Sequence, residues 1–386
     1  MAIEGWRRLV SVYNDRHTMA FSLDQFSDAF RRFKFSLSSK DGESVLGVDI
    51  GTATIKVVQV KQVKGSAVLE TYGEIALGPY ANAEVGQAVN PPVEKISEAL
   101  TDVLRESNAV SKTAGFSVPL SASLINVITL PTKDPNDLAS MVPIEARKYI
   151  PVPVGEVTLD WFVIPEEEAK FLSAQGEKKE NTSDVLLVAI HNQMLQKLQT
   201  ITQAVSITPR FFEVEPFSVG RASYEHTALP TMVIDLGASS SRVYVVEFGI
   251  IDRAHTIGRG GQDLTLSIAK STGITFAEAE NLKRDKGLGT SESGSAGLDF
   301  IFSEARRIFL TYQRKEGKAI SQVVLVGGGA ALKGISEVAG KYFDTRVVIG
   351  SPFDKLTTPA FIGDMLKGAG PSFASAVGLA LRALQR

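Results

Sequence analysis

Two short segments of this sequence each combine an aspartate, a glycine and small hydroxyl side chains in the same order. They are residues 48–54 (VDIGTAT) and residues 234–240 (IDLGASS). Glycine lets a backbone come close to a phosphate, and successive N–H groups in a tight turn form a concavity that binds anions. The aspartates, Asp49 and Asp235, are suited to hold a hydrated Mg²⁺ together with phosphate oxygens and water. If the two segments face one another, they would clamp a triphosphate from both sides.

A third segment, residues 324–332 (VLVGGGAAL), runs from an apolar strand through three glycines into a helix. A strand that opens in this way lets a nucleotide come close to the backbone. The segment is not a Walker A motif, because no Gly-Lys-Ser/Thr follows, and its spacing differs from the dinucleotide fingerprint. Each of the three segments alone is also compatible with an ordinary turn. Their combination in one chain predicts a nucleotide site.

The elements that must position these segments follow from the hydrophobic pattern. Residues 44–50 and 55–61 are apolar and β-branched on either side of small residues, which predicts a hairpin. Residues 232–236 and 242–248 predict a second hairpin of the same kind. The remaining pattern predicts strands at 68–75, 114–118, 124–130, 158–164, 185–190 and 322–326, and helices at 92–107, 136–149, 193–205, 262–272, 276–286, 298–315, 330–341 and 371–385.

Residues 111–205 are interpreted as an α/β unit inserted between the two hairpins. Its helix at 136–149 contains Pro143, which predicts that the helix either starts or kinks there. The charged segment 165–184 is interpreted as a solvated loop without chemistry, because charge runs of this kind are usually exposed.

The first 44 residues differ from the rest, since they are rich in aromatic residues and arginines and carry no strand pattern. Between residues 21 and 37 the apolar positions recur every three or four residues, which predicts one face of a helix. Arg31, Arg32 and Lys34 lie beside that face. Such a helix suits a membrane surface or the groove of a partner. Docking on its own domain is equally compatible, because an apolar stripe does not choose its partner.

Length, charge and composition limit which classes of function the chain can have. The chain has 386 residues, which suggests two or three domains, and its net charge of −2 gives no global attraction to nucleic acid. It has no cysteine, which excludes disulfides and thiolate metal sites and is compatible with a reducing compartment. No apolar run approaches the roughly 20 residues that cross a bilayer, and no signal-peptide pattern is present. We therefore expect a cytoplasmic protein that does not bind nucleic acid.

The three nucleotide segments, in this order, resemble the phosphate-1, phosphate-2 and adenosine motifs of the actin-like ATPase superfamily, from residue 45 to the C-terminus. The resemblance implies an α/β, actin-like (sugar kinase/Hsp70/actin) fold of two duplicated halves, with ATP or ADP and Mg²⁺ in the cleft. It places on the first side of the phosphates Asp49, Gly51, Thr52, Thr54 and Lys56, on the second side Asp235, Gly237, Ser239 and Ser240, and at the adenosine Gly327, Gly328 and Gly329. Asp49 and Asp235 would hold Mg²⁺ through water.

The same resemblance suggests roles for three further residues. Glu280 and Lys283 are similar to the family's ribose and adenine contacts on a helix of the second half. Glu215, which precedes Pro216, resembles the carboxylate that orients the attacking water in several members. An acidic residue at the start of a helix is the alternative interpretation of Glu215.

Finer motifs resemble one family of this superfamily. They are Leu130-Pro131, residues 145–153 (EARKYIPVP), residues 214–217 (VEPF) and residues 371–381 (PSFASAVGLAL). Together they are similar to PilM, the type IV pilus assembly family, which is related to the cell-division protein FtsA. The resemblance implies a cytoplasmic adaptor, peripheral to the inner membrane, that binds ATP. It also implies binding to the cytoplasmic N-terminal tail of the inner-membrane protein PilN and contact with other proteins of the pilus inner-membrane complex.

The family organisation divides the chain into an N-terminal extension and three parts. The ranges are 1–44 for the extension; 45–110, 206–230 and 371–386 for the first core subdomain (1A); 111–205 for the FtsA-type inserted subdomain (1C); and 231–370 for the second half (2A and 2B). The partner groove would lie between the first core subdomain and the inserted one, near residues 130–150.

Three functions fit these observations. The first is an adaptor in which the nucleotide state tunes partner binding, with at most slow ATP hydrolysis; a ligand shifts such an equilibrium only by its different affinities for the two states. The second is a small-molecule kinase of the same fold, which would need an aspartate base at the acceptor hydroxyl that we cannot place. The third is a filament-forming, membrane-associated ATPase similar to FtsA, in which the chain self-associates.

Overall fold

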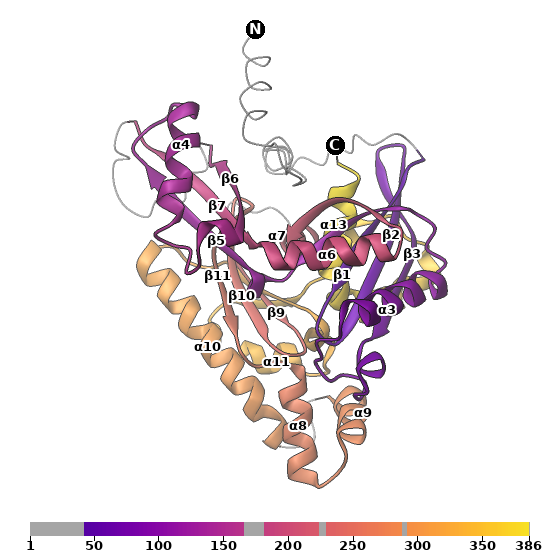
Figure 1. The fold of residues 1–386 in the computed structure, drawn as a ribbon. Helices are drawn as coiled ribbons and strands as arrows, with labels where there is room; N and C mark the ends of the chain where they lie inside the picture. The colour runs from indigo at the N-terminus through magenta and orange to yellow at the C-terminus, as the bar shows by residue number, and fades with distance from the viewer. Residues whose placement is uncertain (1–41, 166–180, 224–228, 288–291, 386) are drawn as a thin grey trace.

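The computed structural model describes residues 42–165, 181–223, 229–287 and 292–385. These residues form two five-stranded sheets, one three-stranded sheet and the helices that cover them (Figure 1). Almost all of the N-terminal extension, including the amphipathic helix and the membrane contact expected at 21–37, lies outside the described residues.

The first sheet has the strand order β3-β2-β1-β4-β8. The first three strands form an antiparallel meander, and β4 and β8 continue the sheet in parallel with β1. The strands are β1 (Ser44–Ile50), β2 (Thr54–Val63), β3 (Ser66–Ala76), β4 (Thr113–Val118) and β8 (Thr208–Val214). Parallel neighbours need crossover connections, and here one of these crossovers carries the inserted unit.

Helices cover both faces of the first sheet. One face packs against α3 (Val93–Glu106) and α6 (Asn192–Ala204). The other packs against the C-terminal helix α13 (Ala374–Ala383), which in turn packs on α7 (Glu215–Ser223). Glycine permits these close approaches, since a Cβ on Gly47 of β1 would lie 1.9 Å from the Ala376 carbonyl oxygen of α13.

The second sheet repeats the same plan, with the order β11-β10-β9-β12-β13. Its first three strands are antiparallel, and β12 and β13 run parallel to β9. The elements are β9 (Thr231–Leu236), β10 (Ser241–Glu247), β11 (Ile250–Ile257), β12 (Gln322–Val326), β13 (Arg346–Ile349), α8 (Gly261–Thr272), α9 (Phe276–Lys286), α10 (Glu292–Glu316) and α11 (Ile335–Gly340). Residues of α8, α10 and α11 share one hydrophobic core with this sheet. The duplication that the resemblance implied is therefore present in the strand order.

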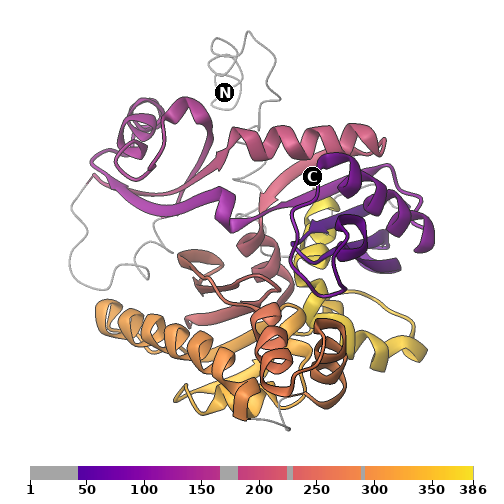
Figure 2. The same cartoon turned by 60° about the horizontal axis from the view of Figure 1, so that its bottom comes forward.

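The inserted unit is an antiparallel sheet of order β5-β7-β6 with one helix. Its elements are β5 (Ser123–Leu130), α4 (Pro135–Ala146), β6 (Val157–Val163) and β7 (Ser183–His191). Helix α4 begins where the Asp134 carboxylate accepts the N–H of Asn136 at 2.8 Å, and it continues past Pro143. Figures 1 and 2 show this unit at the upper left of the molecule, and its strand β5 contacts β11 of the second half.

Two boundaries differ from the sequence prediction. The strand at 113–118, expected inside the inserted unit, pairs with β1 and belongs to the first sheet. Helix α6, expected to close the unit, packs on α3 of the first half.

The predicted helices at 330–341 and 371–385 each begin with a separate 3₁₀ turn. The short elements are η2 (Gly78–Ala81), η3 (Leu120–Ala122), η4 (Val154–Glu156), η5 (Gly328–Ala331), η6 (Pro352–Lys355), η7 (Ala360–Ile362), α12 (Gly363–Ala369) and η8 (Gly370–Phe373).

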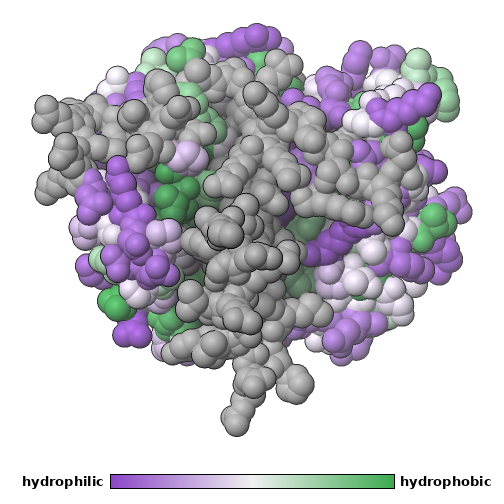
Figure 3. Space-filling model, turned by 90° about the horizontal axis from the view of Figure 1, so that it is seen from above, coloured by the Kyte–Doolittle hydropathy of each residue, from purple (hydrophilic) through white to green (hydrophobic). Residues whose placement is uncertain are grey.

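The described surface gives no sign of a bilayer span. No helix within the described ranges is long and apolar enough to cross a membrane. Seen from above, hydrophobic residues occur at separate places among hydrophilic ones on the described part of that face (Figure 3). Single exposed apolar residues of this kind are ordinary for a folded protein.

Candidate functional site

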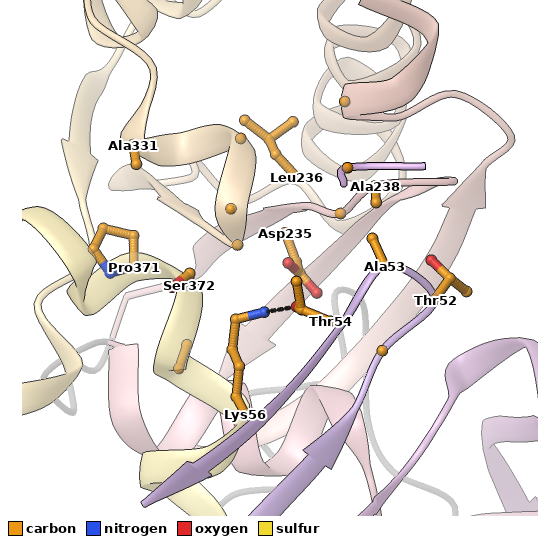
Figure 4. A pocket seen from close by; sticks show the side chains of 18 of the residues that line it. Thr52, Ala53, Thr54, Lys56, Asp235, Leu236, Ala238, Ala331, Pro371 and Ser372 are labelled. Carbon is orange, nitrogen blue, oxygen red and sulfur yellow. Dashed lines mark hydrogen bonds between the residues drawn. The ribbon is translucent and has the colours of Figure 1, made fainter. Parts of the chain in front are cut away.

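The turns of the β1–β2 and β9–β10 hairpins face each other across a cavity of about 410 Å³ between the two halves (Figure 4). Most of the residues predicted from the sequence line this cavity. They are Asp49, Gly51, Thr52, Thr54, Lys56, Glu215, Asp235, Gly237, Ser239, Glu280, Lys283, Gly327, Gly328 and Gly329. Ser240 is not among the lining residues, and its carbonyl oxygen instead lies 2.7 Å from where a Cβ on Gly237 would be.

The two turns touch at their tips. The Thr52 hydroxyl donates to the Ser239 hydroxyl at 3.2 Å, across the cleft between the halves. Within the first turn the Gly51 N–H donates to the Thr54 carbonyl at 3.0 Å, which closes the bend. In the second turn the Gly237 carbonyl accepts the N–H of Gly261, the first residue of α8, at 2.9 Å. Backbone and hydroxyl groups of both halves therefore converge at one end of the cavity.

Two carboxylates share one guanidinium on the cavity floor. Arg242 of β10 lies with its Nε 2.9 Å from Glu215 Oε2 and its Nη1 3.3 Å from Asp235 Oδ2. Glu215 is the first residue of α7, the helix that links the two sheets, and its Oε2 also accepts the Leu120 N–H at 3.2 Å. The charges are nearly excluded from solvent, since the side chains of Glu215, Asp235 and Arg242 are 7%, 13% and 15% exposed.

Burial is the largest cause of the pKa shifts of Glu215 and Asp235. It raises the pKa of Glu215 to about 7; Arg242 opposes this shift, and Asp49 and Asp235 add to it. Burial likewise raises the pKa of Asp235, again against Arg242 and with a contribution from Asp49. The neighbouring carboxylate of Glu215 raises the pKa of Arg242, so the guanidinium stays charged. Perturbed acids in a cleft are typical of functional sites.

Asp49 is the acid whose surroundings fit a bound cation. Its Oδ1 is buried, and no described residue donates a hydrogen bond to it. A buried carboxylate oxygen without a partner is costly, and water or a cation satisfies it. Within the described ranges no three His, Asp or Glu side chains form a metal site by themselves. The buried Asp49 oxygen without a partner suits Mg²⁺, which takes few carboxylates and completes its shell with water and phosphate oxygens.

Lys56 lies beside these acids on β2. Its ammonium group donates to the Thr54 hydroxyl and lies 3.2 Å from Glu74 Oε1. The side chains of Asp235, Thr54 and Lys56 are directed toward the same part of the cavity (Figure 4). Lys56 is therefore a nearly buried base that lines the same cavity as Asp49 and Asp235.

The three glycines after β12 lie against the second hairpin. Gly327 has a φ of +82°, and a Cβ there would lie 2.3 Å from Asp235 Oδ1. A Cβ on Gly329 would lie 2.7 Å from the Cβ of Leu236. Because only glycine fits both places, the backbone can come this close to the hairpin and leave the cavity open beside it.

Glu280 and Lys283 of α9 belong to one buried network beside the second hairpin, where the Lys283 ammonium group donates to the Gly261 carbonyl at 3.1 Å. The Glu280 Oε2 accepts from Lys283 and from the Thr265 hydroxyl, both at 2.6 Å, and its Oε1 accepts from Arg284 at 2.8 Å. Burial acts to raise the pKa of Glu280, but Lys283 and the other donors outweigh it and lower the pKa. The ionised carboxylate is thus held in place at the edge of the cavity.

A loop of the first half crosses to this network. A Cβ on Gly86, whose φ is +93°, would lie 2.7 Å from Glu280 Cδ. The Ala88 N–H donates to Gln262 Oε1 of α8 at 3.0 Å, and the Val89 N–H donates to the Thr52 carbonyl at 2.8 Å. We call residues 83–92 the cleft loop.

The sequence prediction missed Arg242 and the cleft loop. Arg242 had a signal, since the hairpin register places it directly opposite Asp235. The cleft loop had none, because Gly86 meets Glu280 only after both halves have folded.

Comparison with known proteins decides the family. The family model described as Type IV pilus assembly protein PilM matches residues 47–384. This chain belongs to that family. A solved structure described as the PilM-PilN type IV pilus biogenesis complex is similar with a TM-score of 0.75 and 22% identity, over 89% of this chain and 99% of that one.

More distant relatives of the PilM family agree on the fold. The ethanolamine utilization protein EutJ from Carboxydothermus hydrogenoformans matches with a TM-score of 0.51 and 15% identity, over 90% of this chain and 93% of that one. The cell division protein FtsA of Enterococcus faecalis (strain ATCC 700802 / V583) is 22% identical over 80% of this chain and 78% of its own length. The predicted actin-like fold and the relation to FtsA are thereby confirmed.

Proposed function

We propose that this chain is a nucleotide-binding adaptor of the type IV pilus assembly machine. The observation that supports this most directly is the convergence of two separately encoded Asp-x-Gly turns and a glycine run on one cavity. Backbone N–H groups, hydroxyls and Lys56 surround the end of the cavity that a triphosphate would occupy. The nucleoside would lie between Gly327–Gly329 and the buried Glu280 network.

Asp49 and Asp235 would hold Mg²⁺ through water. The metal would neutralise phosphate charge, which otherwise meets three carboxylates in a buried site. Glu215 would orient a water, because its carboxylate lines the cavity and has a pKa of about 7. We propose that hydrolysis is slow and secondary to binding.

The proposed partner is the cytoplasmic N-terminal tail of PilN. The support is membership of the PilM family and the similarity to a solved PilM-PilN complex. We propose docking between the first core subdomain and the inserted unit, near residues 130–150, where Ile144 and Tyr149 are 63% and 41% exposed. This would place the protein on the cytoplasmic face of the inner membrane, beside other pilus proteins.

The nucleotide would act on the partner through the cleft. The Thr52–Ser239 contact and the cleft loop both join the two halves beside the cavity. A nucleotide bound in this cavity would contact residues of both halves, so it would favour one separation of the halves over another. It changes partner affinity only as far as the two separations differ in their affinity for the tail.

A binding titration tests both parts of the proposal. A fluorescent peptide with the PilN tail sequence is titrated with the full chain in ATP, ADP or no nucleotide, each with Mg²⁺. We expect binding that differs between nucleotide states. Ile144→Asp with Tyr149→Asp should weaken it at least about tenfold, which is 1.4 kcal/mol. Phe361→Asp is the matched control, since Phe361 is also apolar and 89% exposed but lies outside the inserted unit. A peptide that does not bind in any state would contradict the adaptor function.

A further inference from the structure

The two oxygens of the Glu215 carboxylate have different surroundings. Oε2 receives the Arg242 guanidinium at 2.9 Å and the Leu120 N–H at 3.2 Å. No described residue donates a hydrogen bond to Oε1, and Glu215 lines the cavity. One oxygen is therefore anchored, and the other is left for a group inside the cavity.

The two anchoring donors come from different parts of the molecule. Arg242 lies on β10 of the second half. Leu120 begins η3, the turn between β4 of the first sheet and β5 of the inserted unit. Glu215 itself begins α7, which connects the two sheets. The carboxylate therefore lies where the first half, the second half and the root of the inserted unit meet.

The charges around Glu215 make an anchor necessary. Asp49 of β1 and Asp235 of β9 both repel its ionised form, and burial disfavours that form as well. Arg242 is the described cation that contacts Glu215, while the charge of Lys56 on β2 favours the ionised form of Asp235. A buried carboxylate among like charges keeps a fixed, ionised orientation only if a cation and hydrogen bonds hold it.

We propose that Arg242 and the Leu120 N–H position Glu215, by holding Oε2 so that Oε1 faces the water that attacks the nucleotide. This positioning role rests on the proposed nucleotide binding and adds a way in which hydrolysis is regulated. Neither group touches the nucleotide's reacting atoms, so both act only through Glu215. Because Arg242 comes from the second half and Leu120 from the root of the inserted unit, hydrolysis depends on both a closed cleft and the placement of that unit.

The first test separates binding from the chemical step at Arg242. Affinity for a fluorescent ATP analogue and single-turnover hydrolysis of radiolabelled ATP are measured with Mg²⁺ for the full chain. Arg242→Gln should slow hydrolysis about tenfold or more with nucleotide affinity changed less than about threefold. Arg242→Lys should recover part of the rate, because an ammonium group supplies the charge without the planar fork. Arg307→Gln, on the exposed side of α10, is the matched control and should leave both quantities unchanged.

The second test removes only the donor at residue 120. Leu120→Pro deletes the N–H at the first residue of a 3₁₀ turn, where proline is tolerated, and Pro119 before it already has an extended ψ of 139°. Leu120→Ala keeps the N–H and measures the loss of the buried side chain alone. The proline variant should hydrolyse ATP at least about threefold more slowly than the alanine variant, at equal nucleotide affinity.

The third test does not depend on hydrolysis. In nucleotide-free protein, amide hydrogen exchange at Leu120 should be faster in Arg242→Gln than in Arg307→Gln, because a carboxylate that has lost its cation holds the N–H less well. Combining Glu215→Gln with Arg242→Gln should slow hydrolysis no more than Glu215→Gln alone, since the two groups act as one unit.

The outcomes separate this proposal from the proposed function. A chain that binds nucleotide and tail but hydrolyses ATP equally well with Arg242→Gln or Glu215→Gln overturns the positioning role alone. Additive losses in the double variant, or unchanged exchange at Leu120, overturn it as well. A chain that binds no nucleotide overturns the proposed function, and the positioning role with it.

Discussion

Arg242 occupies in the second hairpin the position that Lys56 occupies in the first. Each base lies directly opposite the aspartate of its own hairpin, in the registers Asp49 with Lys56 and Asp235 with Arg242. Side chains that are directly opposite in an antiparallel pair project from the same face of the sheet. The duplicated fold therefore supplies each of these two hairpins with one acid and one base.

The two bases nevertheless serve different partners. Lys56 contacts Thr54 and Glu74 within its own half. Arg242 contacts Asp235 in its own half and Glu215 at the start of the connecting helix. One copy of the duplicated pair thus remains with its turn, and the other joins the two halves of the molecule.

The acid of each pair gives the most direct test of the nucleotide site. Asp49→Ala and Asp235→Ala should each weaken binding of a fluorescent ATP analogue with Mg²⁺ at least about tenfold, because Mg²⁺ loses an acceptor for its bound water. Equilibrium titration measures this. Asp364→Ala is the control, since that side chain is fully exposed to solvent on α12. Wild-type affinity in both cavity variants would show that these aspartates do not hold the ligand.

The cleft loop should control how fast nucleotide leaves. Gly86→Ala places a Cβ 2.7 Å from Glu280 Cδ and so pushes the loop away from the second half, which also breaks the Ala88–Gln262 bond. We expect a fluorescent ADP analogue to dissociate about tenfold faster in a stopped-flow chase, since affinity changes arise mostly in dissociation.

Gly65→Ala is the matched control for the cleft loop. Gly65 has a similar positive φ of +80°, but a Cβ there meets nothing within 4 Å. It therefore reproduces the backbone strain of the Gly86 variant without the collision. Equal dissociation rates in the two variants would mean that strain, and not the contact with Glu280, determines nucleotide release.

The sequence predicted those parts of the site that are encoded locally. Each Asp-x-Gly turn belongs to a single hairpin, so its apolar strands, its aspartate and its glycine lie together in the sequence, from Ser44 to Val63 in the first half and from Thr231 to Glu247 in the second. The glycine run after β12 is similarly compact. A pattern this short can be recognised without knowing what packs on it.

What the sequence did not predict depends on contacts between distant residues. Strands β8, β11 and β13 were missed, and β13 is only four residues long, from Arg346 to Ile349, with a polar start. β4 was placed in the inserted unit because the pattern shows a strand but not which strand it pairs with. The position of Gly86 on Glu280 joins residues of different halves, and no local pattern encodes it.

The raised pKa of Glu215 predicts a pH effect on stability. The folded pKa of about 7 lies above the ordinary value of 4.5, so between these values the folded chain holds a proton that the unfolded chain has lost. Stability from this group is therefore full below pH 4.5 and is lost as the pH rises to 7. Relative to Glu215→Gln, the nucleotide-free wild type should lose on the order of 1–3 kcal/mol over that window in urea unfolding. A difference that stays constant with pH would show that Glu215 is ionised throughout.

A second buried ionic group should matter for stability rather than for nucleotide. Glu213 of β8 bonds Arg221 of α7 twice at 2.8 Å and Arg382 of α13 at 2.6 Å, and its side chain is 1% exposed. Burial alone would raise the pKa of Glu213, but the two guanidinium groups outweigh it and lower the pKa. Glu213→Gln removes the negative charge that both guanidinium groups contact, so we expect a loss of about 3 kcal/mol in the free energy of unfolding.

The control for this prediction is an ion pair of similar length at the surface. Lys95 and Glu98 are 2.6 Å apart on α3, with both side chains about half exposed. Glu98→Gln should cost less than about 0.5 kcal/mol, because water and salt screen that pair. Urea unfolding of the two variants in the same buffer compares them directly. Glu213 bonds residues of both α7 and α13, so its loss loosens the packing of these helices on the first sheet. Equal losses of stability from the two substitutions would mean that burial adds nothing to the contribution of the Glu213 ion pairs.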